Sequence, residues 1–278
     1  MSELILQGQA LENEMVKSVC AQFGGTPISK GHYVQISTEK QVELADIATF
    51  NDLFPIDISL LPEDFNPHNV KLVISDMDST LINIECIDEV ADFIGKKAEV
   101  SAITEAAMSG ELDFKGSLTR RVALLKGLDV SALERVFVER LKLNPGAEQL
   151  LERLRSKNIQ FALVSGGFTF FTQQLKEQLG FAYCHANELE IFDQKLTGNL
   201  VGGIVDAKVK AEYLQSLCDE LGVGPECAVA IGDGANDLEM MSLAGLGVAY
   251  HAKPKVQAQA DCTLNHSGLD GLLALLDI

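Results

Sequence analysis

The sequence lacks the cysteine spacings that build disulfide frameworks and structural zinc sites. Its six cysteines form no C-x-x-C pair, and no histidine lies at zinc-ligand spacing from Cys20, Cys86, Cys184, Cys218, Cys227 or Cys262. This usage is typical of scattered buried thiols in a reducing compartment. The cysteines therefore argue against a secreted, disulfide-stapled protein.

Long apolar runs and an excess of positive charge are also absent. The N-terminal segment MSELILQGQALENEM has no basic start, and no apolar run approaches the ~20 residues of a membrane span. The chain carries 22 Lys and Arg against 40 Asp and Glu, a net charge of −18. A field of that sign repels nucleic acid and anionic membranes, so we expect the protein to bind neither. From the lack of a signal-like start or membrane-spanning run we expect a cytoplasmic protein. The negative field also repels phosphate esters, so any phosphate site must gather its cations locally.

What the chain does contain is enough apolar sequence for a sizeable core. Hydrophobic residues make up 47% of its 278 residues and are spread along the whole length. Domains usually span about 100–200 residues, which predicts one large and one small domain.

Residues 1–66 have the pattern of a small α+β domain. Strand candidates at 4–6, 26–28, 33–36 and 56–60 alternate with helix candidates at 11–23 and 41–50. The order β-α-β-β-α-β is typical of the ferredoxin-like fold and of ACT regulatory modules. A degenerate spacer or a homodimer contact are the alternatives. Two prolines mark residues 61–67 as a linker.

From residue 71 onwards the pattern is α/β. Short apolar strands are expected at 71–75, 159–164, 228–231 and 246–249, and helices at 169–179, 208–221, 236–244 and 269–276. This alternation predicts a Rossmann-like parallel sheet, covered by helices on both faces, over residues 71–278. Such sheets bind ligands beyond the carboxyl ends of their strands.

Two segments exceed what a simple crossover needs. Residues 84–143 are nearly all helical, which predicts an inserted helical cap over the strand ends. Within this region Ser131 and Glu134 have the spacing of a capping box, and just after it Asn144-Pro145 is expected to start a helix. Residues 187–201 alternate like a small hairpin insertion that turns near Asp193.

Acidic residues follow two of the predicted strands. Asp76 and Asp78 come directly after the first strand, and Asp233 and Asp237 follow the strand at 228–231. Buried carboxylates without partners are costly, and a hard cation is a suitable partner. The alternatives are a solvated acidic turn for the first pair and a glycine-rich turn with helix capping for the second.

Two further features suit a phosphate ligand. Ser165, Gly166 and Gly167 end the strand at 159–164 and precede a helix, a geometry that offers a hydroxyl and backbone N–H groups to an anion. Lys210, near the start of a helix, would supply positive charge, with Lys208 as the competing residue. Taken singly, a strand-to-helix turn and a surface lysine explain them equally well.

Together these motifs resemble the haloacid dehalogenase (HAD) superfamily of phosphohydrolases, from about residue 71 to the C-terminus. Within it, the chain is similar to the phosphoserine phosphatase family at 76–81, Glu85, 165–168 and 232–237. The resemblance implies hydrolysis of O-phospho-L-serine to serine and phosphate, the last step of serine biosynthesis.

The same resemblance implies a role for each matched residue. Asp76 would be the nucleophile that becomes an aspartyl-phosphate, and Asp78 the general acid and base. Mg²⁺ would be held by the side chains of Asp76 and Asp233 and the backbone carbonyl of Asp78, with Asp237 in support. The residues implied to hold the phosphoryl oxygens are Ser165, Gly166, Lys210 and Asn236.

The resemblance assigns substrate recognition to the cap. Glu85 would pair with the substrate ammonium, Arg121 with its carboxylate, and Met108 and Phe114 would line the pocket. Phe114 and Arg121 are seven residues apart, hence on one helix face. Helix capping by Glu85, a solvated Arg121 with Arg120 in its place, and core packing of Met108 and Phe114 are the alternatives.

Two other functions remain open from the sequence. A phosphotransferase would pass the phosphoryl group from Asp76 to an alcohol, and the motifs do not separate water from alcohol as the acceptor. A phosphatase for another small phosphorylated metabolite is similar in kind. An amino-acid-sensing regulatory protein, with residues 1–66 as its working part, belongs to a different class.

Overall fold

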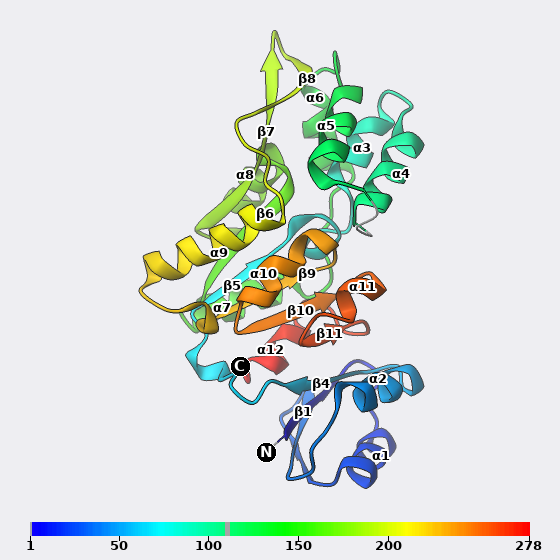
Figure 1. The fold of residues 1–278 in the computed structure, drawn as a ribbon, viewed down its shortest axis with the longest axis vertical. Helices are drawn as coiled ribbons and strands as arrows, with labels where there is room; N and C mark the ends of the chain where they lie inside the picture. Colours follow the sequence, from blue (N-terminus) through cyan, green and yellow to red (C-terminus); the bar gives the residue numbers. More distant parts are fainter. Residues whose placement is uncertain (1, 109–111) are drawn as a thin grey trace.

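The computed structural model describes residues 2–108 and 112–278 and is organised around a seven-stranded sheet (Figure 1). The strand order is β11-β10-β9-β5-β6-β7-β8, and the pairs are parallel except for the antiparallel β7–β8. The strands are β5 (Leu72–Ser75), β6 (Gln160–Phe168), β7 (Tyr183–Phe192), β8 (Lys195–Val201), β9 (Ala228–Gly232), β10 (Leu246–Tyr250) and β11 (Cys262–Leu264). The predicted α/β class is confirmed.

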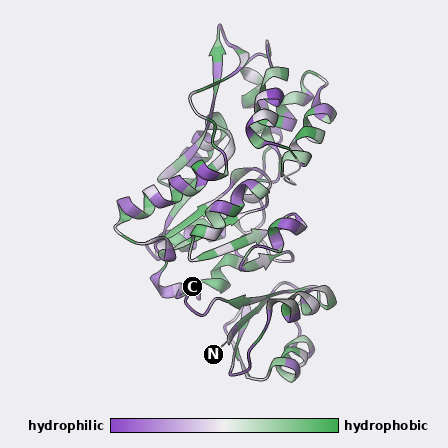
Figure 2. Cartoon of the chain, viewed as in Figure 1, coloured by the Kyte–Doolittle hydropathy of each residue, from purple (hydrophilic) through white to green (hydrophobic). Residues whose placement is uncertain are grey.

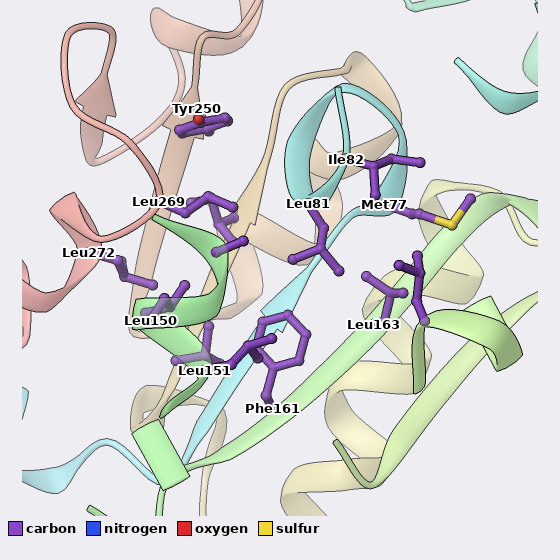
Figure 3. Packing of buried hydrophobic residues seen from close by; sticks show 14 of the residues in the cluster. Met77, Leu81, Ile82, Leu150, Leu151, Phe161, Leu163, Tyr250, Leu269 and Leu272 are labelled. Carbon is purple, nitrogen blue, oxygen red and sulfur yellow. The ribbon is translucent and has the colours of Figure 1, made fainter. Parts of the chain in front are cut away.

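The central strands are apolar on both faces because helices cover both. Leu72 and Ile74 pack on one side, beneath helices α9 (Ala207–Leu221) and α10 (Leu238–Leu243). Val73 points to the other side, towards α7 (Ala147–Ser156), α8 (Thr169–Leu179) and α12 (Gly271–Leu275). Figure 3 shows part of this second layer, where Phe161 lies beside Leu151. Figure 2 shows the strands of the large sheet in green, the colour of hydrophobic residues, at the centre of the molecule. Because the strands are buried on both faces, polar side chains that can bind a ligand are expected only at the strand ends.

Two sequence-based boundaries were wrong, and two short elements were missed. Strand β6 does not end at Val164 but continues through the two glycines to Phe168, which pairs with Asn187 of β7. Helix α7 begins at Ala147 rather than at Pro145, because Gly146 turns the backbone with a φ of 80°. The short elements α11 (Pro254–Gln257) and β11 were not predicted.

The expected capping box is also absent from the start of α6 (Ser131–Glu139). The N-cap is Val130, which makes no side-chain cap. Asp129 instead accepts a hydrogen bond from the Ser131 backbone N–H at 3.0 Å. Asp129, two residues before Ser131, therefore satisfies a backbone N–H at the start of α6 in place of the serine.

The long insertion between β5 and β6 forms helices at one end of the molecule (Figure 1). These are α3 (Cys86–Asp92), α4 (Lys97–Met108), α5 (Phe114–Leu124) and α6, here called the cap. The hairpin β7–β8 lies beside it, and residues Asp193 and Gln194 form its turn with positive φ. Gly127 donates to Leu196 at 2.8 Å and Val130 to Gln194 at 2.9 Å, so backbone hydrogen bonds join hairpin and cap.

Residues 2–61 form a second, antiparallel sheet at the opposite end (Figure 1). Its order, β2-β3-β1-β4, with two helices and a separate apolar cluster, is the ferredoxin-like arrangement. The elements are β1 (Ser2–Gln7), α1 (Asn13–Phe23), β2 (Thr26–Ser29), β3 (Tyr33–Thr38), α2 (Leu44–Leu53) and β4 (Asp57–Leu61). A role as a regulatory module or dimer contact stays a prediction.

A buried carboxylate fastens this N-terminal unit to the core. Asp57 is 1% exposed and accepts backbone hydrogen bonds from Asn265 at 2.7 Å, His266 at 3.0 Å and Ser267 at 2.8 Å. Three consecutive N–H groups converging on one carboxylate form an anion nest. The nest follows β11, at the far edge of the sheet from the cap.

None of the helices described within 2–108 and 112–278 is both long and apolar enough to span a bilayer.

Candidate active site

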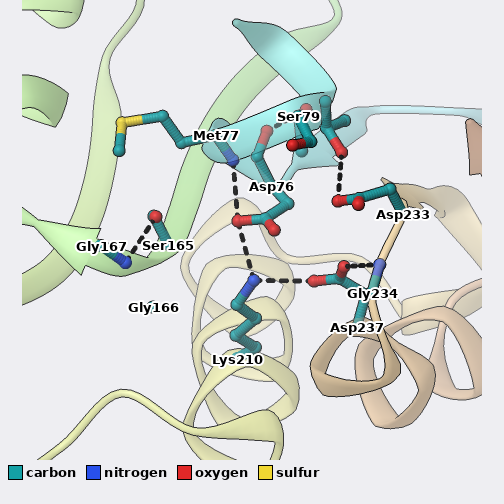
Figure 4. A network of polar contacts seen from close by, with 12 residues as sticks. Asp76, Met77, Ser79, Ser165, Gly166, Gly167, Lys210, Asp233, Gly234 and Asp237 are labelled. Carbon is teal, nitrogen blue, oxygen red and sulfur yellow. Dashed lines mark hydrogen bonds and ion pairs between the residues drawn. The ribbon is translucent and has the colours of Figure 1, made fainter. Parts of the chain in front are cut away.

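Three aspartates converge where β5 and β9 end. Asp76 continues β5, its backbone N–H donating to the Ile231 carbonyl of β9 at 3.0 Å, and Asp233 follows β9 directly. Carboxylate oxygens of Asp76, Asp233 and Asp237 lie within 4.8 Å of one another, and all three residues are buried (Figure 4). Adjacent parallel strands bring residues 157 positions apart into one cluster, since their carboxyl ends share an edge of the sheet.

Lys210 is the cation of this cluster. It projects from the first turn of α9, whose N-terminus is capped by Asp206, and its side chain is fully buried. Its Nζ lies 2.8 Å from Asp76 Oδ1 and 2.7 Å from Asp237 Oδ1. The competing Lys208 is at the surface, paired with Glu212.

The cluster has more negative than positive charge. One ammonium faces three buried carboxylates, so the described side chains alone do not neutralise it. Burial, together with the nearby Asp237, raises the pKa of Asp76 to about 7 although Lys210 opposes the shift. Burial also raises the pKa of Asp233 well above its usual range. Three carboxylates with this excess of negative charge suit a hard divalent cation, which prefers oxygen ligands.

Asp78 lies outside this cluster and faces the adjoining cavity. Its Oδ1 accepts a hydrogen bond from the Cys86 backbone N–H at 3.0 Å, and burial raises the pKa of its carboxyl. The following Ser79 has a φ of 56°, which turns the chain sharply. Asn144 holds this turn by donating to the Thr80 carbonyl at 2.8 Å. The Asn144 side chain therefore supports this turn and does not cap a helix.

The glycines at the end of β6 allow the chain to approach both the acid and the cap. A Cβ on Gly167 would lie 2.6 Å from Asp78 Oδ2, and one on Gly166 would lie 2.6 Å from the Phe114 ring. The Ser165 hydroxyl accepts the Gly167 N–H at 2.8 Å. Any side chain at either glycine would therefore push the cap or the acid away.

The cap closes this site from above with charged groups of both signs. Glu85 and Arg121 line the same cavity as Asp76, Asp78, Ser165, Gly166 and Asn236, with Phe114 on the cap side. Arg121 is 5% exposed, and its Nε has no hydrogen-bond partner among the described residues. Asn236 Oδ1 is likewise unpartnered there. Such buried, unsatisfied polar atoms need a ligand or water.

The alternatives for the cap residues can now be weighed. Glu85 occupies the N-cap position of α3 without capping it, and its carboxylate accepts the Ser79 hydroxyl at 2.6 Å. Arg120 is exposed, whereas Arg121 turns inwards. Met108 ends α4, but its side chain lies outside the described residues.

A family comparison agrees with this geometry. The profile of the haloacid dehalogenase-like hydrolases matches residues 70–245, which hold Asp76, Lys210, Asp233 and most of the sheet. The chain belongs to the haloacid dehalogenase-like hydrolase family. The hydrolase fold and the superfamily membership that the sequence predicted are confirmed.

Comparison with individual proteins shows which members of the family this hydrolase is similar to. A phosphoserine phosphatase of Polaromonas sp. is 51% identical over 79% of this chain and 95% of its own length. A probable phosphoserine phosphatase from Vibrio cholerae, solved without ligand, has a TM-score of 0.83 at 37% identity, covering 99% of this chain and 86% of that one. A substrate-bound phosphoserine phosphatase complex has a TM-score of 0.72 at 39% identity, over 74% and 98% of the two chains. The predicted resemblance to phosphoserine phosphatases is confirmed.

Two residues that build the hydrolase site were given no role in the sequence analysis. Thr80 donates its hydroxyl to Asp233 at 3.2 Å, and Thr104 accepts a hydrogen bond from Arg121 at 2.9 Å. Thr80 lies within residues 76–81, which carry the family resemblance, so this motif could have revealed its role. Thr104 carried no such signal, because it meets Arg121 only through the packing of two helices.

Proposed function

We propose that this enzyme hydrolyses O-phospho-L-serine to serine and phosphate through an aspartyl-phosphate on Asp76. The observation that carries the proposal is a single cavity in which Asp76 and Asp78 face Glu85 and the unsatisfied Arg121. The relatives named phosphoserine phosphatase support the same substrate. The last step of serine biosynthesis and a cytoplasmic location are proposals that follow from this substrate and from the sequence.

The cavity offers a complementary partner for each charged group of phosphoserine. The guanidinium of Arg121 suits a carboxylate, which it can bind by two parallel hydrogen bonds. Glu85 suits the substrate ammonium. The phosphoryl oxygens would meet Lys210, the Ser165 hydroxyl, the backbone at Gly166 and the Asn236 side chain. Phe114 closes the cavity over Gly166 and would limit the entry of water.

The reaction needs one nucleophile and one proton carrier. A carboxylate oxygen of Asp76 attacks phosphorus, and the bond from phosphorus to the serine oxygen breaks. Asp78, whose pKa is raised by burial, gives its proton to the departing serine oxygen. It then takes a proton from the water that attacks the aspartyl-phosphate, which releases phosphate and restores Asp76.

The excess of negative charge in the aspartate cluster supports Mg²⁺ as the cofactor. Asp76 and Asp233 would hold the ion, and Asp237, whose oxygens bind Lys210 and the Gly234 N–H, would support them. Coordination by the Asp78 backbone carbonyl stays a prediction. Bound there, the ion would offset the repulsion between carboxylate and phosphate and the charge that spreads over the phosphoryl oxygens.

Removing the carboxylate-binding group should change substrate preference. For Arg121→Ala we expect kcat/KM for phosphoserine to fall about 100-fold, because a charge-assisted, bidentate contact is lost. Activity on phosphoethanolamine, which has the ammonium but lacks the carboxylate, should change less than about threefold by the same reasoning.

Steady-state kinetics with both esters measure this difference, with the exposed Arg120→Ala as the matched control. Equal losses on both esters would remove Arg121 from carboxylate recognition. A wild-type enzyme that does not prefer phosphoserine would contradict the proposed substrate.

Removing a metal-holding carboxylate should weaken Mg²⁺ binding independently of turnover. Mg²⁺ should raise the Tm of the wild-type protein, because it binds the folded cluster and not the unfolded chain. For Asp233→Asn the Mg²⁺ concentration that gives half of this shift should rise by at least about tenfold. Thermal unfolding across a Mg²⁺ series measures it, and Asp64→Asn, in the exposed linker, is the control. Identical Mg²⁺ responses in both variants would place the ion elsewhere.

A further inference from the structure

We propose that Thr104 and Asp88 are positioning residues that hold Arg121 in the orientation required for a carboxylate-bearing substrate. This inference rests on the proposed function, because it concerns how the carboxylate of that substrate is recognised. It adds two residues from outside the matched motifs to the determinants of specificity.

The three residues come from three different helices of the cap. Arg121 on α5 donates from Nη1 to the Thr104 hydroxyl on α4 at 2.9 Å. The Thr104 hydroxyl in turn lies 2.8 Å from Asp88 Oδ1 on α3, and the Ser101 hydroxyl donates to Asp88 Oδ2 at 2.6 Å. Asp88 is 7% exposed, Thr104 3% and Arg121 5%, so the network is shielded from solvent. A threonine hydroxyl can accept from Arg121 and donate to Asp88 at the same time.

The arrangement places a negative charge near Arg121 without forming an ion pair with its guanidinium. Within 2–108 and 112–278, no ion pair within 4.0 Å joins Arg121 to a carboxylate. Burial lowers the pKa of Arg121, and the nearby carboxylates of Glu85 and Asp88 oppose that shift, so both favour the charged guanidinium. Thr104 stands between Asp88 and Arg121. A direct Asp88–Arg121 pair would compete with the substrate carboxylate, and the threonine prevents that competition.

The geometry also determines which edge of the guanidinium is available. Thr104 engages Nη1, while Nε has no partner among the described residues and Arg121 lines the cavity. A bidentate contact needs two N–H groups presented in one plane, and a rotated guanidinium loses that alignment. Anchoring Nη1 therefore preserves the recognition geometry before substrate arrives, which lowers the cost of binding.

The decisive variant is Thr104→Val, which keeps the shape of the side chain and removes the hydroxyl. We expect KM for phosphoserine to rise about tenfold with little change in kcat, because one anchoring hydrogen bond to a charged group is lost. KM and kcat for phosphoethanolamine should stay within about twofold, since that ester has no carboxylate to orient. Thr104→Ser, which restores the hydroxyl, should return the phosphoserine KM to within about threefold of wild type.

Two further variants separate positioning from a general effect on the fold. Thr119→Val is the matched control, because the Thr119 hydroxyl binds only the Lys115 carbonyl of its own helix among the contacts described. Asp88→Asn removes the counter-charge and should raise the phosphoserine KM in the same selective way. If Thr104→Val fails to fold, Asp88→Asn carries the test.

The outcomes distinguish this inference from the proposed function. Equal changes on both esters, or an unchanged phosphoserine KM in Thr104→Val and Asp88→Asn, would overturn the positioning role. A wild-type enzyme without preference for phosphoserine over phosphoethanolamine would instead overturn the proposed function on which the inference rests.

Discussion

Replacing Asp76 with asparagine should lower the turnover of phosphoserine by at least about 10⁴-fold, because an amide oxygen cannot form the acyl phosphate. The fold should persist. The substituted amide would keep the shape of the side chain at a position where Met77 and Lys210 donate to Oδ1. It would also remove one of three clustered carboxylates, so we expect the unfolding free energy to stay within about 2 kcal/mol of wild type.

Rapid-quench measurement of phosphate release and chemical unfolding test the two parts of this prediction. Asp64→Asn, in the linker, controls for the chemistry of the substitution. An Asp76→Asn enzyme that retains near-full activity at saturating Mg²⁺ would show that another residue is the nucleophile. An unfolded variant would direct the test to Asp76→Glu, which keeps a carboxylate but displaces it and should still be severely impaired.

Lys210→Met should produce the second largest loss of activity and a larger loss of stability than Asp76→Asn. Without the ammonium, Asp76 and Asp237 face each other unpaired in a buried site, and breaking a buried ion pair typically costs about 3–5 kcal/mol. The phosphate ester would also meet a more negative cluster. We therefore expect kcat/KM to fall about 10³-fold, the usual scale for a lost electrostatic contact in the transition state.

Lys208→Met is the matched control on the same helix. Its ammonium pairs with Glu212 at the surface, and exposed pairs contribute little. Steady-state kinetics and urea unfolding of both variants measure the contrast. If the two methionine variants behave alike, Lys210 is not the cation that offsets the substrate's charge.

The sequence was most informative where burial is complete or where charges follow a strand. The apolar runs around Val73 and Val229 could belong only to covered strands, and Asp76 and Asp233 follow them directly. The cap was predictable because the chain between Asp76 and Gln160 is too long for one crossover. Lys210 was predictable mainly from the family resemblance, since a lysine near a helix start is ordinarily exposed.

What escaped prediction depends on tertiary contacts. Strand β6 runs past Val164 because Phe168 finds a partner in Asn187, which local pattern alone does not reveal. Asn144 looks like a helix start but binds the carbonyls of the Asp78 turn. Asp88 and Thr104 are 16 residues apart, on different helices, and no spacing rule connects them to Arg121.

The attachment of Asp57 to residues 265–267 has a consequence for attempts to shorten the protein. Excising residues 2–66 would strip a carboxylate from three backbone N–H groups that it now satisfies, and would bare the apolar side of β11 at Cys262. The remaining hydrolase would then expose an empty anion-binding site for sulfate or phosphate, remote from the catalytic cleft. An exposed apolar sheet edge would lie beside this site. Anions in the buffer would then stabilise the shortened protein, whereas in the 278-residue chain Asp57 already satisfies these N–H groups.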